Sequence, residues 1–484
     1  MQPKLKGLAL LFSLQFCALL LLAQKDLPQD YLTKEFHKGR REAARALMPD
    51  NSVLVVFAAP TRTFSNDVEY LYHQNPDLYY FTGYKEPHAV LFLFKEAQTG
   101  VDGRPFNEVF FVQEKNARQE QWTGRRLGEQ GVKEKLGIDA AYNGQAFKDF
   151  PLDLTGFSKI ITDELPEDVK NTRSRADLYD LITQFKAKAR INDTLKNEKV
   201  DYRLFQQITS RLREIKTPEE LVLLRKAVEI SCIGQNEVMK TIRPDMSELE
   251  LQGLHEYVHK RYGAEGVGYG SIVGAGENGC ILHYTENSRT RIGNNLLLMD
   301  VGAEYHGYTA DVTRTIPAHG KFSKTERAIY QIVYDAQEAA FKTLKDGSKW
   351  SDANSAAQET IANGLLKLGI IKEKGEARRY YPHGLGHHIG LDVHDKGSYD
   401  TLRKNMVLTI EPGIYIPENS PCDKKWWGIG VRIEDDALIT ENGYELLSSF
   451  APRSIEGIEK MIAEKSVLDN YKLPPLKSAA KKAF

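Results

Sequence analysis

Five side chains of metal-binding type follow one another in the last two fifths of the 484-residue sequence: Asp300, Asp311, His387, Glu411 and Glu434. Four carboxylates and one imidazole, without a thiolate, form a hard donor set that suits two divalent cations better than one. Buried together without cations, four carboxylates would repel one another and retain protons. We therefore expect two divalent metal ions, with Mn²⁺ favoured and Co²⁺ or Zn²⁺ as alternatives. Such a pair polarises a carbonyl group and stabilises a developing oxyanion, which is hydrolase chemistry.

The two aspartates stand on a predicted strand pair. The runs LLLMD, ending at Asp300, and TADVT, containing Asp311, read as strands joined across Glu304–Gly307. A turn centred on Tyr305-His306 would place the aspartates opposite each other, with Cβ atoms about 4.5–5.5 Å apart. Either aspartate alone could simply cap a turn. Two of them in register predict a shared role in metal binding.

Histidines gather in the segment HGLGHHIGLDVHD, which holds His383, His387, His388 and His394. A single histidine here would more often be a structural hydrogen-bonding group than a ligand. The cluster predicts at least one ligand. Glu411 ends the strand-like run VLTI just before a proline, which turns the chain.

The segment GVRIEDD holds the last expected ligand. Arg432 and Glu434 are two residues apart in a predicted strand, so both should project from one face. Arg432 could neutralise excess carboxylate charge or bind a substrate group. We expect Asp435 and Asp436 to be solvated turn residues.

A second pattern, HEYVH at His255–His259, matches the HExxH motif of zinc peptidases. Its histidines would lie one turn apart on the same side of a helix. The helix is short and highly charged, it ends at Gly263, and no third ligand stands out. We expect a solvated face of an amphipathic helix, with a zinc site as the alternative.

Composition and termini limit the remaining classes of function. The formal net charge is −1 and basic residues are dispersed, which argues against a nucleic-acid partner. Lys4 and Lys6 precede an apolar run, Leu8–Ala23, that is shorter than a membrane span. We expect a signal peptide at residues 1–23 and export to the periplasm or medium, without stable membrane insertion after cleavage. An uncleaved anchor is the alternative.

Three cysteines would remain after cleavage: Cys232, Cys280 and Cys422. This odd, sparse set makes no disulfide framework, and we expect small buried hydrophobic residues. A Cys280 nucleophile assisted by His283 is the alternative to metal chemistry, but it lacks an orienting group.

The length predicts two domains. VLVVF, AVLFLF and EVFFV are buried-strand candidates that alternate with helical stretches around Arg118–Leu136 and Arg175–Lys188, which describes an α/β domain at residues 30–190. Residues 191–215 read as a linker with a helix. Thr217-Pro218-Glu219-Glu220 is a clear helix start. A second domain at 216–465 holds every expected ligand, and residues 466–484 form a basic tail.

The motifs resemble the pita-bread metallopeptidases, a family that includes methionine aminopeptidase, prolidase and aminopeptidase P. The matching segments are YGSIVGAGENGCILHY, DVGAEYHGYTADVTRTIP, HGLGHHIGLDVHD, TIEPGIYI and GVRIEDD, and all five ligand positions of the family are filled. The segment SNDVEYLYHQNPDLYYFTGYKEPHAVLFL resembles the N-terminal domain of the aminopeptidase P branch. The resemblance implies an α/β N-terminal domain followed by an α+β pita-bread catalytic domain. Some aminopeptidases P carry a bulky aromatic residue where this chain has His388, a departure that could alter the substrate pocket.

This resemblance also implies roles for the residues. Asp300 would hold one metal ion, His387 and Glu411 the other, and Asp311 and Glu434 would bridge the two. The implied catalytic groups are Glu411 as proton shuttle, His283 and His394 for substrate positioning and oxyanion stabilisation, and His383 and Arg432 for orienting substrate. The implied activity is hydrolysis of the bond between an N-terminal residue and a following proline, in a homodimer or homotetramer. A prolidase restricted to Xaa-Pro dipeptides, and a non-enzymatic binding module of this fold, are the other possibilities.

Overall fold

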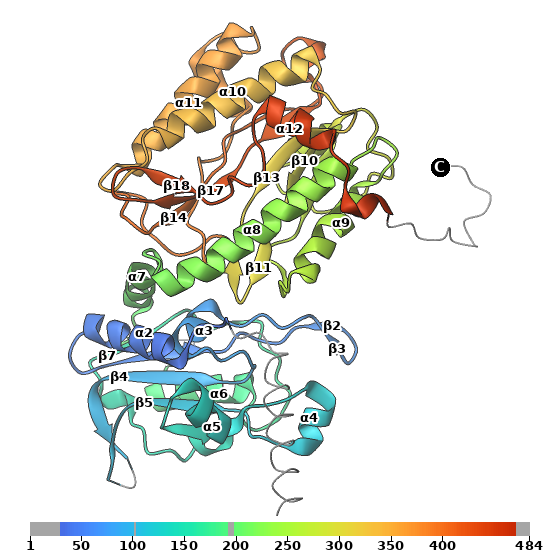
Figure 1. Ribbon diagram of the computed structural model, residues 1–484. Coiled ribbons are helices and arrows are strands. Elements are labelled where there is room, and N and C mark those ends of the chain that lie inside the picture. The colour runs from blue at the N-terminus through green and yellow to red at the C-terminus, as the bar shows by residue number, and fades with distance from the viewer. Residues whose placement is uncertain (1–29, 101–102, 192–197, 471–484) are drawn as a thin grey trace, which may run out of the picture.

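Two domains lie one above the other in the computed structural model, which describes residues 30–100, 103–191 and 198–470 (Figure 1). Helix α7 (Tyr202–Arg213) lies at their junction. Residues 1–23, the predicted signal peptide, and residues 471–484 of the predicted tail lie outside the described residues. Within those described ranges, no helix is both long enough and apolar enough to cross a bilayer.

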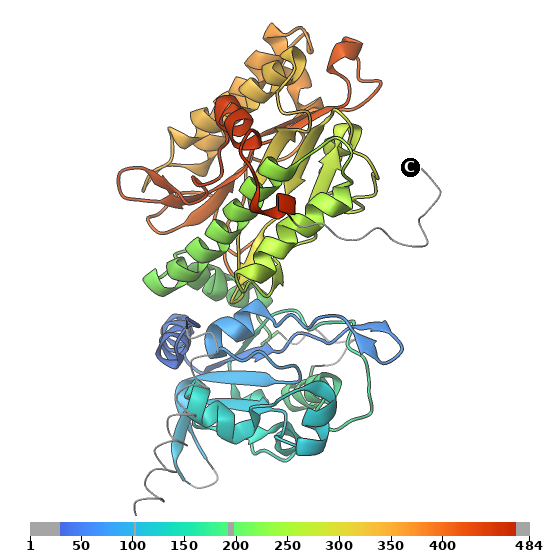
Figure 2. The same ribbon diagram turned by 45° about the vertical axis from the view of Figure 1, so that its right-hand side comes forward.

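The first domain is built on a five-stranded mixed sheet in the order β6-β5-β4-β1-β7. Strand β4 is antiparallel to β1 and β5, whereas β7 is parallel to β1 and β6 is parallel to β5. The sheet strands are β1 (Ser52–Phe57), β4 (Val90–Thr99), β5 (Pro105–Val112), β6 (Ala141–Asn143) and β7 (Lys159–Thr162). The helices are α2 (Lys34–Leu47), α3 (Pro76–Thr82), α4 (Ala117–Thr123), α5 (Gly128–Gly131) and α6 (Leu178–Ala189). A small hairpin, β2 (Thr63–Ser65) with β3 (Val68–Glu69), projects from one side (Figure 2).

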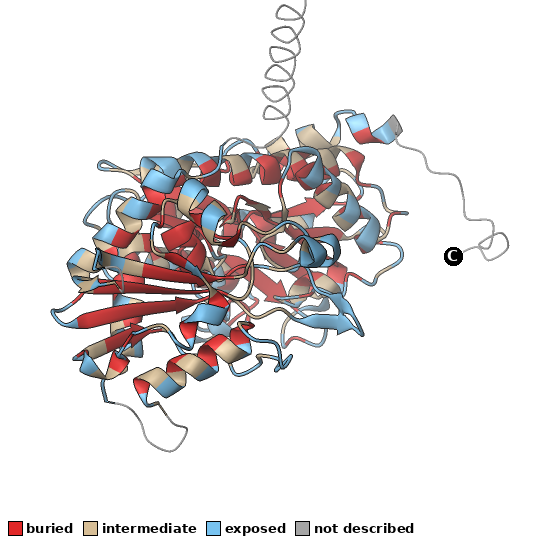
Figure 3. Ribbon diagram, turned by 90° about the horizontal axis from the view of Figure 1, so that it is seen from below, coloured by how far each residue is buried: buried red, intermediate tan, exposed pale blue. Residues whose placement is uncertain are grey.

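Both faces of this sheet are covered, which explains why its central strands read as continuous apolar runs. On β1, Val53 and Val55 belong to the hydrophobic cluster that contains Phe185 of α6, whereas Leu54 and Val56 belong to the cluster that contains Phe36 of α2. Figure 3 shows the strands as buried and the helices as buried on one side only. The predicted α/β domain is therefore present.

The predicted helical stretch at Arg118–Leu136 is interrupted. Helix α4 ends at Gly124, whose φ of 90° leaves the helical region, and Gly128 at φ 62° opens the short helix α5. A π-helical turn, Val132–Leu136, completes the stretch. Glycine tolerates these positive φ values and breaks the continuous helix that the apolar spacing suggested.

The second domain combines helices with short antiparallel strands. Its helices are α8 (Pro218–Thr241), α9 (Glu248–Arg261), α10 (Lys324–Phe341), α11 (Trp350–Lys367) and α12 (Ile455–Ile462). Its strands are β8 (Gly266–Val267), β9 (Ile272–Ala275), β10 (Leu296–Asp300), β11 (Ala303–Tyr305), β12 (Tyr308–Thr309), β13 (Thr313–Pro317), β14 (Val407–Ile410), β15 (Gly413–Ile416), β16 (Ile429–Arg432), β17 (Asp435–Ile439) and β18 (Tyr444–Leu446). The strands form sheets in the orders β13-β10-β9, β12-β11-β8, β14-β17-β18 and β15-β16.

Local sequence explains where the principal helix of this domain begins. Thr217 caps α8: its side chain accepts a hydrogen bond from the Glu220 N–H, and the Glu220 carboxylate accepts one from the Thr217 N–H. Pro218 occupies the first turn, where no N–H is needed. The predicted helix start is confirmed.

Candidate metal centre and active site

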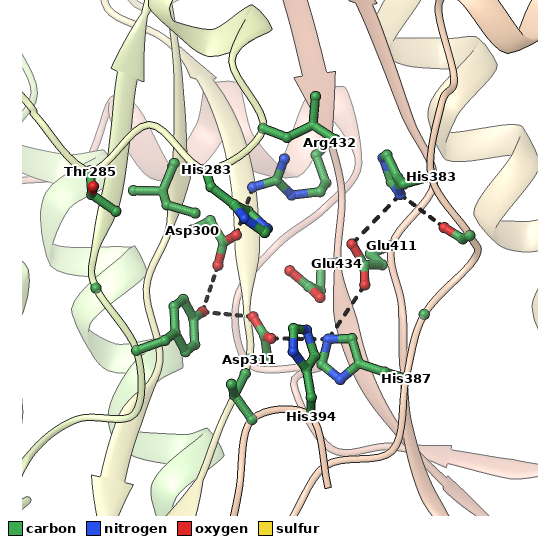
Figure 4. A pocket seen from close by; sticks show the side chains of 17 residues that line it. His283, Thr285, Asp300, Asp311, His383, His387, His394, Glu411, Arg432 and Glu434 are labelled. Atoms are coloured by element: carbon green, nitrogen blue, oxygen red, sulfur yellow. Dashed lines mark hydrogen bonds and ion pairs between the residues drawn. The ribbon is translucent and has the colours of Figure 1, made fainter. Parts of the chain in front are cut away.

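All five expected metal ligands line one cavity of about 430 Å³ in the second domain. Figure 4 shows their side chains converging on one point. Asp300 ends β10 and Asp311 precedes β13, whereas Glu411 directly follows β14, Glu434 follows β16 and His387 comes from a loop. His283, His383, His394 and Arg432 line the same cavity. The structure thus brings together side chains that are up to 151 residues apart in the sequence, from His283 to Glu434.

The register of the hairpin differs from the expectation. Asp300 pairs with Thr313, and Tyr305 pairs with Tyr308, so the turn lies one residue later than predicted and Asp311 is not directly opposite Asp300. The correction shifts the pairing by two residues, and because side chains alternate with a period of two, both aspartates still project from the same face. The Tyr269 hydroxyl lies 2.5 Å from Asp300 Oδ1 and 2.6 Å from Asp311 Oδ1, which shows that the two carboxylates are close neighbours.

His387 stands between two of the carboxylates. Its Nε2 lies 3.5 Å from Asp311 Oδ2 and 3.5 Å from Glu411 Oε1. Its Nδ1 is 3.1 Å from the carbonyl oxygen of His388, so an Nδ1–H donates there and leaves Nε2 free to face the carboxylates. A separation of 3.5 Å is long for a hydrogen bond but suits donors that share an ion about 2 Å from each.

Glu434 and Asp300 are held by neighbouring polar groups. The Thr313 hydroxyl donates to Glu434 Oε2 at 2.6 Å. Arg432 donates from Nη2 to Asp300 Oδ2 at 2.6 Å and from Nη1 to the Tyr415 hydroxyl at 3.0 Å. The buried guanidinium therefore compensates part of the carboxylate charge and fixes the orientation of Asp300.

The remaining predicted catalytic residues surround the carboxylates. The ring of His394 packs edge-on against that of His387, with centroids 4.3 Å apart. His383 is held between the Tyr415 hydroxyl, 2.9 Å from Nε2, and the Gly384 carbonyl, 2.8 Å from Nδ1. His283 is exposed at the rim of the cavity.

Burial and mutual repulsion raise the pKa of three of the four carboxylates; burial would also raise the pKa of Asp311, but its contacts with His387 and Tyr269 lower it. Burial and the charge of Asp311 raise the pKa of Glu411 to about 7, and the same two causes raise the pKa of Asp300. Burial, with neighbouring carboxylates, raises the pKa of Glu434 well above its usual range. Burial alone would lower the pKa of His387, but Asp311 and Glu411 raise it to about 9. Carboxylates crowded in this way need positive charge to ionise together.

The donor set fits divalent cations. One ligand atom each from Asp311, His387 and Glu434 lie within 4.8 Å of one another, and the described residues hold no other such group of three or more. Asp300 and Glu411 line the same cavity and add the oxygen donors that a pair of ions requires.

Comparisons with known proteins agree with this geometry. Residues 222–441 match the model of metallopeptidase family M24, and residues 37–159 match that of the aminopeptidase P N-terminal domain. An Xaa-Pro aminopeptidase of Escherichia coli is 37% identical over 89% of this chain and 98% of that protein. The mitochondrial intermediate cleaving peptidase 55 of Arabidopsis thaliana is 31% identical over 88% of this chain and 83% of the relative.

The chain belongs to metallopeptidase family M24. Solved structures support the assignment: aminopeptidase PepP of Pseudomonas aeruginosa superposes with a TM-score of 0.78 at 35% identity, covering 90% of this chain and 98% of that one. Aminopeptidase P from E. coli with the inhibitor Pro-Leu gives a TM-score of 0.79 at 35% identity, covering 89% and 98%. The predicted fold class, an α/β domain followed by a pita-bread catalytic domain, is confirmed, and this M24 peptidase is a hydrolase that uses divalent metal.

Several groups that support the site of the M24 peptidase were not identified from the sequence. Tyr269 contacts two of the ligands, and Thr313 contacts Glu434. Asp436 accepts a hydrogen bond from the Asp311 N–H at 3.2 Å, and Thr409 donates one to Glu411 at 3.3 Å. Tyr269 is remote from the ligands in the sequence, whereas Thr313, Thr409 and Asp436 each lie two residues from a ligand but are of residue types that carry no distinctive pattern.

The expectation for the two acidic residues that follow Glu434 was wrong. Asp435 and Asp436 are fully buried in β17, not solvated, because Asp435 pairs with the buried Arg314 at 2.7 Å and Asp436 faces the backbone of Asp311. His388 does not line the metal cavity; its Nε2 lies 2.9 Å from the Ser398 carbonyl oxygen in the protein interior.

The HExxH helix of the M24 peptidase is not a solvated face. His255 and His259 are 0% and 1% exposed, and none of their ring nitrogens has a hydrogen-bond partner within the described chain. No third donor of metal-binding type joins them among the described residues, so the structure does not support the zinc alternative. The thiol alternative is also disfavoured, since burial raises the pKa of Cys280 to about 12 and opposes the reactive thiolate.

Proposed function

We propose that this M24 peptidase is an Xaa-Pro aminopeptidase that removes the N-terminal residue from peptides with proline in the second position. The observation that carries the proposal is a complete ligand set in one cavity, in a chain that matches an Xaa-Pro aminopeptidase at 37% identity over 98% of that relative. The matched N-terminal domain favours this activity over that of the single-domain members of the family.

The proposed cofactor is a pair of Mn²⁺ ions, because the donors are carboxylates and one imidazole without a thiolate. Asp300 would hold one ion, His387 and Glu411 the other, and Asp311 and Glu434 would contact both. When bound, the ions polarise the scissile carbonyl and activate a water molecule. Co²⁺ or Zn²⁺ would occupy the same donors, so metal analysis after purification in defined medium tests the identity of the ion.

The chain's own groups supply proton transfer and orientation. Without metal ions, burial and the charge of Asp311 raise the pKa of Glu411 to about 7, and bound cations would lower it, so that the carboxylate could accept and release a proton. We assign to it the transfer of a proton to the leaving proline nitrogen. His283 and His394, at the edge of the cavity, would bind the peptide and donate to the developing oxyanion. His383 and Arg432 would orient the substrate and the carboxylates.

The decisive experiment compares three substrates: an Xaa-Pro dipeptide, an Xaa-Pro-Yaa tripeptide, and the tripeptide with alanine in place of proline. We expect kcat/KM to be highest for the Xaa-Pro-Yaa peptide and to fall strongly without proline. A strong preference for the dipeptide would identify a prolidase instead. Asp311→Ala should abolish both bound metal and activity; unchanged metal content and activity would contradict the site assignment.

Export and oligomeric state are further parts of this proposal. The basic and apolar pattern of residues 1–23 supports cleavage of a signal peptide and a location in the periplasm or medium. N-terminal sequencing of the mature protein, with an initial residue near Gln24, would test it. We also propose a homodimer or homotetramer, which sedimentation at several protein concentrations would test.

A further inference from the structure

His394 lies on a loop, residues 390–398, that contains neither helix nor strand. The start of this loop is joined to the catalytic domain, since the Thr309 N–H donates to the Gly390 carbonyl oxygen at 2.8 Å. Residues 395–398, which follow His394, make side-chain contacts with α3, α7 and the residues just after α7. Backbone bonds hold the base of the loop, where the Asp395 N–H donates to the His388 carbonyl oxygen at 2.9 Å and the Gly390 N–H donates to the Asp392 carbonyl oxygen at 3.1 Å. Because the loop has no regular secondary structure, the position of His394 also depends on the side-chain contacts of the residues that follow it.

Asp395, the residue after His394, is held by two buried cations. Its Oδ1 lies 2.5 Å from Arg213 Nη2, and its Oδ2 lies 2.7 Å from Lys216 Nζ. The three side chains are 1–2% exposed. Gly390 packs against this pair so closely that a Cβ there would lie 2.1 Å from Asp395 Oδ2.

Arg213 continues the network into the N-terminal domain. Its Nη1 donates to Oδ1 of Asp77, on helix α3, at 2.8 Å. Lys396, two residues after His394, donates to the other oxygen of Asp77 at 2.7 Å and to Thr209 of α7 at 3.1 Å. The two sides of the Asp77 carboxylate therefore bind the linker helix and the His394 loop at once.

A third contact repeats the pattern. The N–H and the hydroxyl of Ser398 both donate to Glu214 Oε2, at 3.0 and 2.9 Å. Glu214 follows α7 directly. All of these partners come from α3, α7 and the residues just after α7, and none comes from the strands that carry the metal ligands.

Buried ion pairs of this kind contribute geometry more than net stability. Moving each charged group out of water costs several kcal/mol, and the attraction between the paired groups does little more than offset that cost. Loss of one partner is severe, since it leaves a buried charge without compensation. The carboxylates of Asp77 and Asp395 each contact two cations. The arrangement is therefore rigid, because opening one ion pair would leave a charged group of this network with a lost partner.

We propose that Asp77, Arg213 and Asp395 are positioning residues that hold His394 at the metal cavity, so that docking of the N-terminal domain sets the geometry of this catalytic group. The inference rests on the proposed function. It assigns to the N-terminal domain a part in catalysis within its own subunit, through a continuous set of ion pairs, and it requires no contact between Asp77 and the substrate.

A double-mutant cycle tests the proposal. Asp77→Asn removes the charge that joins Arg213 and Lys396 while keeping the shape of the side chain. We expect kcat for an Xaa-Pro-Yaa peptide to fall about 10- to 100-fold, with KM changed less than about twofold and metal content unchanged. In a His394→Ala background the same substitution should change kcat less than about twofold, since the group that it positions is gone. Equal effects in both backgrounds would overturn the proposal.

Hydrogen exchange supplies a readout that does not depend on residual activity. In Asp77→Asn, amides of residues 390–398 should exchange faster while those of β10 and β14 keep their protection. Unchanged exchange in the loop would contradict the proposal. Arg213→Met should give the same pattern more strongly, and if it fails to fold, Asp77→Asn alone decides.

Arg453→Met is the matched control. It removes a partly buried pair with Glu338, at 2.5 Å, that lies wholly within the catalytic domain. We expect a lower Tm with kcat and loop exchange as in the wild type. The proposed function fails separately: a wild-type protein that cleaves no Xaa-Pro peptide would refute the activity, whereas an active wild type with an additive cycle would refute only the positioning role.

Discussion

Charge balance at individual residues accounts for most of the chemistry of the site. Four carboxylates share a cavity with four histidines and one arginine, and the arginine is paired to Asp300 at 2.6 Å. Without metal ions, burial and mutual repulsion raise the pKa of Glu411 to about 7. The same crowding favours bound cations, which allow the carboxylates to ionise together.

Tyr269 is a residue whose contribution can be isolated. Its hydroxyl contacts both Asp300 and Asp311, and Tyr269→Phe keeps the ring while removing these two contacts. We expect kcat/KM to fall about 10- to 100-fold and metal to bind more weakly, because groups that orient metal ligands typically contribute that much. Steady-state kinetics and metal stoichiometry measure the two effects.

Tyr330→Phe is the control for this substitution. The Tyr330 hydroxyl is also buried and donates to the Arg453 carbonyl oxygen at 2.7 Å, but it lies outside the metal cavity. It should lower stability by about 1 kcal/mol and leave kcat/KM unchanged. Equal kinetic losses in both variants would show that Tyr269 acts only through stability.

Among the elements, the β10–β13 hairpin depends on one glycine. A Cβ at Gly302 would lie 1.8 Å from the backbone oxygen of Ala310, the residue before Asp311 in the segment between β12 and β13. Gly302→Ala should therefore separate the strands, lower the free energy of unfolding by about 1–3 kcal/mol and weaken metal binding. Urea unfolding and metal analysis measure this. Gly253→Ala, at an exposed position of α9 where nothing lies within 4 Å, should instead be neutral or stabilising by up to about 1 kcal/mol.

Helix α9 carries a pH-sensitive element. Burial lowers the pKa of His259 to about 4, whereas an unfolded histidine titrates near 6.5. The unfolded chain therefore binds the proton first as the pH falls from 6.5 towards 4, and stability is lost in that window but not further below it. At pH 5 the loss is about 2 kcal/mol for this one group.

His259→Phe should remove this contribution. The difference in the free energy of unfolding between pH 7 and pH 5, measured by urea titration, should shrink by about 2 kcal/mol relative to the wild type. The exposed His319, changed to Gln, serves as the control and should leave the difference as in the wild type. A His259→Phe protein with an unaltered pH dependence would contradict the assignment.

For the molecule as a whole, the two domains share a hydrophobic cluster. Leu78 and Tyr79 of α3 belong to the same cluster as Leu223 and Leu224 of α8, which begins the catalytic domain. The Asp77–Arg213–Asp395 ion pairs border this contact. Separating the domains would expose apolar surface and would also leave buried charges without partners. We therefore expect the two domains to unfold as one unit.

Calorimetry tests this cooperativity. A single transition is expected, and saturating Mn²⁺ should move all of it to higher temperature, because binding to one part of a cooperative unit stabilises the whole. A separate transition for the N-terminal domain, at a temperature that does not respond to metal, would show that the shared cluster does not couple the domains.

Elements whose formation depends on a few neighbouring residues were predicted correctly from the sequence. The start of α8 follows from Thr217, Pro218 and Glu220, whose capping and first-turn preferences operate within four residues. Three strands of the N-terminal sheet, β1, β4 and β5, followed from uninterrupted apolar runs, whereas β6 and β7 were not predicted. The continuous helix predicted at Arg118–Leu136 was wrong, because two glycines with positive φ interrupt it. The prediction that Asp435 and Asp436 are exposed to solvent was also wrong; it rested only on the acidic type of these side chains.

The sequence by itself determined which donors are present and in what order, because the preference of carboxylate and imidazole for divalent ions belongs to the side chains themselves. Tertiary structure decided how they meet. The hairpin register, the Tyr269 hydroxyl between two aspartates, the burial of Asp436 and the ion pairs from Asp77 to Asp395 all join residues distant in the chain. Such contacts are set by packing of whole elements, and no local pattern encodes them.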